Sequence, residues 1–139
     1  MTALIRLQLA ILVLVELLVG FWNQVFPASF YQTFPTVDLT PPYSEHYARD
    51  FGGATLGIAL VLAIALIFPR AVFVIPATLA YSLYSIPHLF FHVHHLQGAS
   101  SLEAVGLTAA NALVALMGLA AIAMTVARDR RNDNRIGTT

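Results

Sequence analysis

Four of the five histidines of this chain lie in one segment, which reads Pro-His-Leu-Phe-Phe-His-Val-His-His. Because each residue of an α-helix advances about 100°, His88, His92 and His95 fall on one face of a helix. Tyr81 and Ser85 extend the same face toward the beginning of that helix. A row of imidazole and hydroxyl groups can transfer protons, hold a metal ion or hydrogen-bond a ligand. Titratable groups cost free energy in hydrocarbon, so we expect this face to point inward.

A second group of polar residues precedes another apolar segment. The prolines before Ser44 and the Ser44 side chain itself are a signal for the start of a helix. A helix that begins there places His46 and Asp50 on one face, with Arg49 beside them, at the same depth as the histidines. Glu16 stands apart from both groups, about ten residues into the first apolar segment and therefore near the middle of a bilayer.

The composition is typical of a membrane protein. Hydrophobic residues make up 58% of the 139 residues and charged residues only 10%, whereas a soluble domain is about a quarter charged. Four apolar segments are each close to the roughly 20 residues that cross about 30 Å of hydrocarbon. They cover about 3–26, 44–68, 71–95 and 104–127, with an outer loop over 27–43 and a tail over 128–139. We therefore predict an all-α membrane protein with one transmembrane domain, 1–139, folded as an antiparallel four-helix bundle.

The placement of arginine predicts the orientation of these helices. All seven basic residues are arginines, and only Arg49 lies on the side opposite to Arg6, Arg70 and the four arginines after residue 127. Because positive residues stay in the cytoplasm, we expect a multi-pass plasma-membrane protein with both termini cytoplasmic and the histidines at the outer end. The first segment lacks a good cleavage site, so we expect it to be retained.

Other features limit the partners and describe the packing. The chain has no cysteine, which excludes disulfides and thiolate chemistry, and no basic stripe that would predict nucleic acid. The pair Gly53 and Gly57 predicts a close helix contact, and the small residues of the fourth segment predict close packing there. That segment could also join copies of the chain, or a larger membrane complex. Pro87 predicts a kink beside His88, and we expect the aromatic, proline-containing segment 27–35 to lie over the bundle.

Three interpretations of the polar residues remain open. In the first they are structural, because hydrogen bonds from His88 and His92 to Asp50 would fix the register of two helices. In the second they bind a metal ion, since two histidines four residues apart can share one ion and a carboxylate or third imidazole completes the site. That ligand set is His88, His92, Asp50 and His46. Haem held by His46 and His92 from different helices is a variant of the same interpretation.

In the third interpretation, a cleft binds or processes a lipophilic ligand such as a quinone, a sterol-like molecule or a prenyl lipid. The candidates for proton transfer are then Glu16, Asp50 and His88. The ligand-binding residues are His46, Arg49, Tyr81, Ser85 and His92. Glu16 could equally form a hydrogen bond between helices. In this interpretation the protein is an enzyme or a binding protein. The residues predict no particular cofactor, and the expected partners are the membrane lipids around the chain.

Two motifs resemble segments of small actinobacterial integral membrane proteins of unknown function. They are Pro42-Tyr43-Ser44-Glu45-His46-x-x-Arg49-Asp50-x-Gly52, which follows Phe34-Pro35, and Pro87-His88-x-x-Phe91-His92. The resemblance covers roughly 26–107. In plan the chain also resembles DoxX-like four-helix membrane proteins, which include quinone-linked oxidoreductase subunits, and some proteins of similar plan bind sterols. The resemblance implies a four-helix fold and favours a lipophilic ligand or a role as an accessory subunit.

Overall fold

The computed structural model describes residues 1–39 and 42–136, the last two by their backbone alone. Within these residues all the regular structure is helical. Four helices are long and apolar enough to cross a membrane. They are α1 (Thr2–Val25), α3 (Glu45–Ile67), α4 (Ala71–His94) and α5 (Ser101–Ile136), and the short helix α2 (Pro27–Thr33) and the 3-10 turn η1 (Val37–Leu39) lie between α1 and α3. The prediction of an all-α chain with four apolar spans is confirmed.

The start of α3 follows the predicted signal. Ser44 is the N-cap residue, and its hydroxyl group accepts a hydrogen bond from the backbone N–H of Tyr47 at 3.4 Å. The predicted start of the fourth segment was three residues late. Ser100 and Glu103 form a reciprocal capping box, with Ser100 N 2.8 Å from Glu103 Oε2 and Glu103 N 3.3 Å from Ser100 Oγ, so α5 begins at Ser101.

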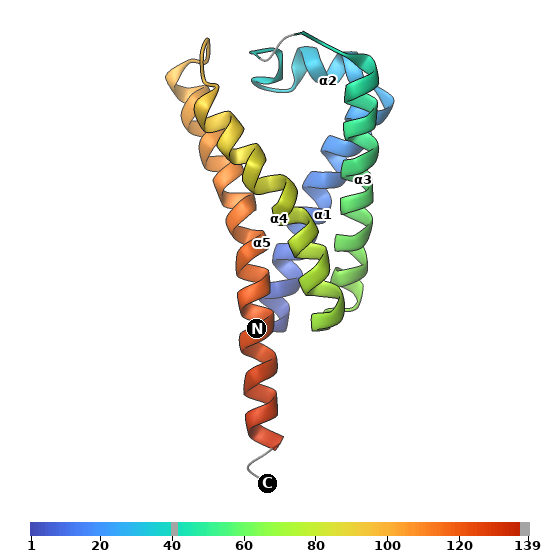
Figure 1. Ribbon diagram of the computed structural model, residues 1–139, viewed down its shortest axis with the longest axis vertical. Coiled ribbons are helices and arrows are strands. Elements are labelled where there is room, and N and C mark those ends of the chain that lie inside the picture. Colours follow the sequence, from blue (N-terminus) through green and yellow to red (C-terminus); the bar gives the residue numbers. More distant parts are fainter. Residues whose placement is uncertain (40–41, 137–139) are drawn as a thin grey trace.

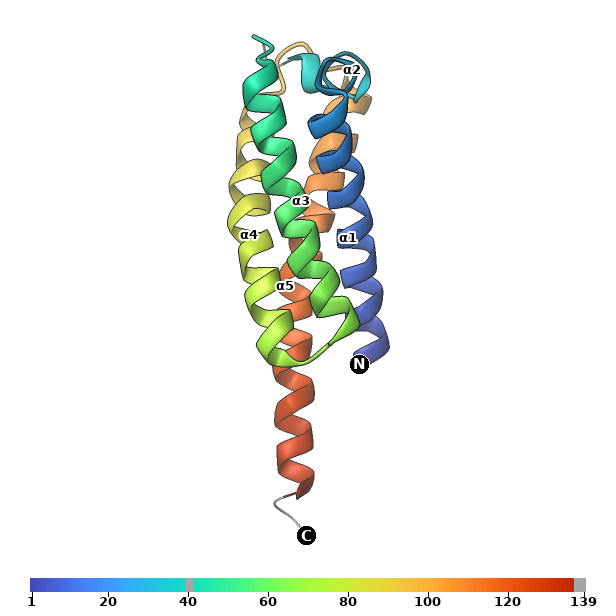
Figure 2. The same ribbon diagram turned by 90° about the vertical axis from the view of Figure 1, so that its right-hand side faces the viewer.

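The predicted tail is the main difference in the helix boundaries. α5 continues without interruption through the arginine-rich segment to Ile136 and contains 36 residues, which corresponds to about 54 Å. No glycine or proline interrupts this segment, and its four arginines have good helix propensity. Helix α5 therefore projects beyond the other helices (Figures 1 and 2). Residues 40 and 41 of the predicted loop and 137–139 of the predicted tail lie outside the described residues.

The long helices associate as two pairs. Helix α1 packs mainly against α3, and α4 mainly against α5. Helix α2 and the α4–α5 connection lie at one end of the molecule, and the N-terminus and the α3–α4 connection lie at the other (Figure 2). The two pairs cross near the N-terminal end and separate toward the end that carries α2 (Figure 1). Below the separation, the two pairs share one apolar core: Ile5, Leu9, Leu12, Leu62, Ala65, Val74, Ala77 and Tyr81.

Two glycines set the close contact between α1 and α3. A Cβ atom on Gly52 would lie 2.6 Å from the backbone nitrogen of Gln24, and one on Gly20 would lie 3.0 Å from the backbone nitrogen of Leu56. The predicted pair behaves differently, because a Cβ on Gly57 would meet nothing within 4 Å. A Cβ on Gly53 would lie 3.3 Å from Gln24 Oε1 of α1, so Gly53 is at the edge of the contact, whereas the close approach itself is made by Gly52 and not by Gly57.

Helix α2 is held across the end of α1 by aromatic side chains. Phe30 is buried and stacks on Phe34 with ring centroids 4.7 Å apart, while Trp22 meets the Phe30 ring edge-on at 5.6 Å. The indole N–H of Trp22 also donates to Ser29 Oγ at 3.2 Å. The segment 27–35 is thus packed over the bundle, as predicted from its composition.

Candidate functional site

The buried face of α1 changes from apolar to polar halfway along the helix. Its buried residues are Ile5, Leu9, Leu12, Glu16, Gly20 and Asn23, which are three or four positions apart and share one face. Glu16 stands where the change occurs and is 3% exposed. Its Oε2 atom is buried without a hydrogen-bond partner among the described residues. A carboxyl group in this position is costly unless something supplies a partner.

Two hydroxyl groups of α4 join Glu16. Tyr81 is fully buried, and its hydroxyl group lies within electrostatic reach of the Glu16 carboxyl group. Ser85, one helical turn further along, is also buried, and its hydroxyl lies near that of Tyr81 without completing a hydrogen bond. Three side chains from two helices therefore meet, and each has a buried oxygen atom that no group in the described part of the chain satisfies.

Helix α4 continues from this buried group toward the end where the helix pairs separate (Figure 1), and further polar side chains follow along it. The ring of Tyr84 lies 5.1 Å from that of His88, and His88 lies 4.4 Å from His92, edge to face. Both imidazole rings are half-buried, and neither makes a hydrogen bond within residues 1–39 and 42–136. The row predicted by helical periodicity, Tyr81, Ser85, His88 and His92, is thus continuous, with Glu16 at its inner end.

The last two histidines of the segment lie within hydrogen-bond distance of backbone carbonyl groups near the end of α4. The Nδ1 atom of His94 lies 2.7 Å from the carbonyl oxygen of Phe90, and that of His95 lies 2.8 Å from the carbonyl oxygen of Phe91. Both rings are exposed, and the ring of His95 stacks on that of Phe91 at 4.0 Å. In the tautomer that donates from Nδ1, they add hydrogen bonds to carbonyl groups in the last turns of α4.

The polar residues at the start of α3 do not join this row. His46 Nε2 lies 3.2 Å from Asp50 Oδ2, and the two side chains are 89% and 66% exposed. Asp50 is two residues before Gly52, so it lies about 200° around the helix from the face that contacts α1. The predicted hydrogen bonds from His88 and His92 to Asp50 are therefore not formed, because the glycine contact rotates Asp50 away.

Arg49 has a contact of a different kind. Its Nε and Nη2 atoms donate to Glu45 Oε1 at 2.9 and 2.8 Å, and its Nη1 atom donates to the carbonyl oxygen of Gln24. This carbonyl lies near the end of α1, where backbone acceptors lack partners within the helix. Arg49, predicted to bind a ligand, instead ties the beginning of α3 to the end of α1.

The proposed metal ligands are split between two helices. His88 and His92 lie together on α4, whereas His46 and Asp50 pair with each other on α3. Across the described ranges, no group of three or more histidine, cysteine, aspartate or glutamate side chains could hold a metal ion. The predicted four-residue ligand set is therefore not assembled, and the His46–His92 pair suggested for haem is split in the same way.

Sequence reasoning missed Tyr84. Its hydroxyl group lies within electrostatic reach of Glu16, and its ring contacts both His88 and Phe51 of α3, the latter at 5.7 Å between centroids. The available signal was the spacing of four residues from His88, which makes the two side chains neighbours on a helix. Gly118, one of the small residues of the fourth apolar segment, packs against this group, because a Cβ there would lie 3.0 Å from the Tyr81 ring.

These features define a class: a chain with four apolar spans, helical throughout its described regular structure, in which a row of polar side chains runs from a buried group toward the end where the helix pairs separate. No protein-family model, curated protein or solved structure matches this chain. The resemblance to actinobacterial and DoxX-like membrane proteins therefore stays a prediction.

Proposed function

We propose that this chain is a plasma-membrane protein that binds a lipophilic molecule with an oxygen-containing head, of which a quinone fits best. Glu16, Tyr81 and Ser85 would hold the head, and His88 and His92 would line the way to it. The observation that carries this proposal is the set of three neighbouring buried oxygen atoms without partners. Buried polar groups are almost always hydrogen-bonded, so an unsatisfied cluster favours a missing partner.

The chemistry of the three oxygen atoms favours a quinone as the ligand. Tyrosine and serine hydroxyl groups donate hydrogen bonds, and quinone carbonyl oxygens accept them. The hydrocarbon of a bilayer offers no water to replace these bonds. A prenyl tail is soluble in that hydrocarbon, so a membrane-soluble quinone is present in the lipid that surrounds the helices. A sterol or prenyl alcohol, whose single hydroxyl group both donates and accepts, is the alternative occupant of the same three groups.

We further propose an antiparallel bundle with both termini in the cytoplasm. The end with the N-terminus carries most of the arginines, namely Arg6, Arg70, Arg128, Arg130 and Arg131. Arg49 belongs to the beginning of α3, near α2. Positive residues favour the cytoplasmic side, which places the histidines and α2 outside.

The single tryptophan offers a direct binding assay. Trp22 lies six residues beyond Glu16 on α1, about 9 Å along the helix axis, and a quinone in the proposed site would quench its fluorescence. We expect saturable quenching when the purified protein is titrated with a decyl-substituted benzoquinone. Tyr81→Phe and Ser85→Ala should each weaken the apparent affinity about two- to twelvefold, since one hydrogen bond is worth roughly 0.5–1.5 kcal/mol.

A matched variant separates recognition from simple partitioning into detergent. Tyr47 is 74% exposed on α3, so Tyr47→Phe removes the same hydroxyl group away from the proposed site and should bind like the wild type. Quenching that never saturates and is equal in all variants would exclude a head-group site. The polar row would then be a structural feature of an accessory or interaction subunit.

A further inference from the structure

A polar surface cavity, open to its surroundings over most of its extent, lies at the opposite end of the molecule from the histidines. It has a volume of about 530 Å³ and is bordered by the start of α1, the α3–α4 connection and α5. The polar side chains that line it are Thr2, Arg70, Arg128, Asp129 and Asn132. None of these residues takes part in the site proposed above.

The charge of this end of the molecule favours an anion. Arg70 is exposed and makes no ion pair within the described part of the chain. Arg128 is 14% exposed in its side chain and forms the wall of the cavity, donating to the carbonyl oxygen of Pro69 and to Asp129 Oδ1, both at 2.7 Å. Asp129 offsets one of these charges. Three more arginines, Arg6, Arg130 and Arg131, lie toward the same end and outnumber the remaining acid, Asp133.

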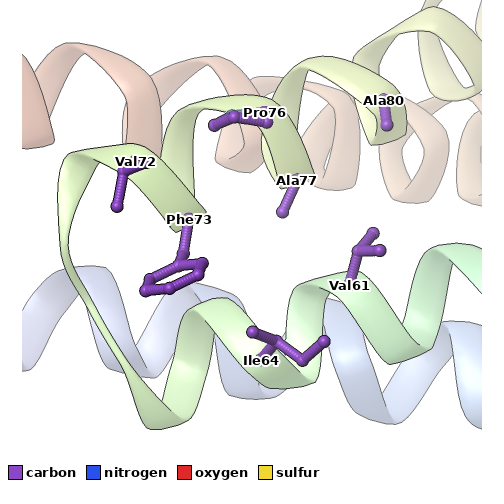
Figure 3. A pocket seen from close by; sticks show the side chains of 7 residues that line it. All are labelled: Val61, Ile64, Val72, Phe73, Pro76, Ala77 and Ala80. Carbon is purple, nitrogen blue, oxygen red and sulfur yellow. The ribbon is translucent and has the colours of Figure 1, made fainter.

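An apolar groove of about 270 Å³ adjoins the polar cavity. Val61 and Ile64 of α3 form one side, and Phe73, Ala77 and Ala80 of α4 form the other, with their side chains directed into the space between the helices (Figure 3). Every residue that lines the groove is apolar. Val72 lines both the groove and the polar cavity, so an amphipathic molecule could occupy the two together.

We propose that the cavity and the groove together bind one anionic phospholipid of the cytoplasmic leaflet. The phosphate group lies between Arg70 and Arg128, and an acyl chain lies along the groove between α3 and α4. Basic pockets beside membrane-spanning helices bind anionic head groups, and each nearby arginine contributes favourably. A soluble phosphate compound would leave the groove unused, and a zwitterionic lipid would add a positive charge beside the arginines.

Native mass spectrometry of the full chain, released from detergent, tests this proposal by counting retained lipids. We expect phosphatidylglycerol to bind more tightly than phosphatidylcholine of the same acyl chains. Arg70→Gln should weaken phosphatidylglycerol binding about fivefold, in line with the contribution of one arginine near an anionic head group. Arg70 suits this test because its side chain makes no capping hydrogen bond. Arg130→Gln removes the same charge from a residue that does not line the cavity, so it should weaken phosphatidylglycerol binding much less than Arg70→Gln does.

A variant in the groove tests whether the acyl chain contributes to binding. Ala80 is exposed and lines the groove, so Ala80→Phe fills it without changing the charge and should also weaken phosphatidylglycerol binding. Ala123→Phe, at an exposed position of α5, is its control. Equal binding of the two lipids, or equal effects of Arg70→Gln and Arg130→Gln, would overturn the proposal. Displacement of phosphatidylglycerol by an equal concentration of glycerol phosphate would overturn it too, because the acyl chain would then contribute nothing.

Discussion

At the scale of one residue, the hydroxyl group of Tyr81 allows a test of whether the polar row is a ligand site or a structural hydrogen-bond network. It is buried without a hydrogen-bond partner in the described structure, and burying such a group costs about 1–3 kcal/mol. Tyr81→Phe should therefore leave the ligand-free protein at least as stable as the wild type while it weakens ligand binding. Thermal unfolding in detergent, followed by circular dichroism, measures the first effect.

The opposite result has a clear meaning. A loss of more than about 1 kcal/mol in Tyr81→Phe would indicate that the hydroxyl group has a partner within the folded protein. Ser82→Ala is the matched control, because the Ser82 hydroxyl donates to the carbonyl oxygen of Thr78 at 2.8 Å in its own helix. That variant should change stability only slightly and should bind the quinone normally.

Residue types alone predicted part of the site. Tyr81, Ser85, His88 and His92 share a face because helical geometry is local, and the structure keeps them in one row with Glu16. The roles of His46, Arg49 and Asp50 depend on the rotation of α3 against α1. Arg49 faces α1 and reaches Gln24, whereas Asp50, the next residue, points away with His46.

At the scale of the elements, the packing of α1 on α3 depends on Gly52. A Cβ at this position would come within 2.9 Å of the carbonyl oxygen of Gly20, a backbone atom that cannot move without the helix. We expect Gly52→Ala to lower the free energy of unfolding by about 1–3 kcal/mol, the usual cost of overpacking. Thermal unfolding in detergent measures this change.

Gly57 provides the control on the same helix. A Cβ there meets nothing within 4 Å, so Gly57→Ala should be neutral or stabilise the protein by up to about 1 kcal/mol, since alanine is the better helix former. Equal losses in the two variants would show that the contact between α1 and α3 is not as described. The motif Gly53-x-x-x-Gly57 predicted a contact by its spacing, but spacing does not say which of two adjacent glycines faces the neighbouring helix.

At the scale of the whole molecule, the orientation in the membrane can be measured with single cysteines, because the chain has none of its own. Gln97→Cys lies between α4 and α5, and Asn132→Cys lies on the projecting part of α5. Positive residues on the cytoplasmic side predict that a membrane-impermeant maleimide labels Gln97→Cys in intact cells. Asn132→Cys should be labelled only after the cells are permeabilised, and the reverse pattern would contradict the proposed orientation.

The surface of the molecule agrees with its composition. Large apolar side chains such as Leu14, Leu83 and Leu102 are 59%, 79% and 83% exposed. In water so large an apolar surface would promote association, whereas lipid tails solvate it. The same property limits what holds the helices together: without a hydrophobic force between them, they rely on close packing of small residues and on specific polar contacts.

The sequence by itself determined the four apolar helices, the cap at Ser44, the aromatic segment over the bundle and the polar face of α4. These features depend on hydrophobicity and on the fixed periodicity of a helix, which involve neighbours in the chain. Only the tertiary structure decided that α1 packs against α3, that Asp50 points away from the histidines of α4 and that Glu16 lies near Tyr81. Those outcomes depend on how each helix is rotated about its axis, and that rotation is set by contacts between residues far apart in sequence, such as Gly20 and Gly52.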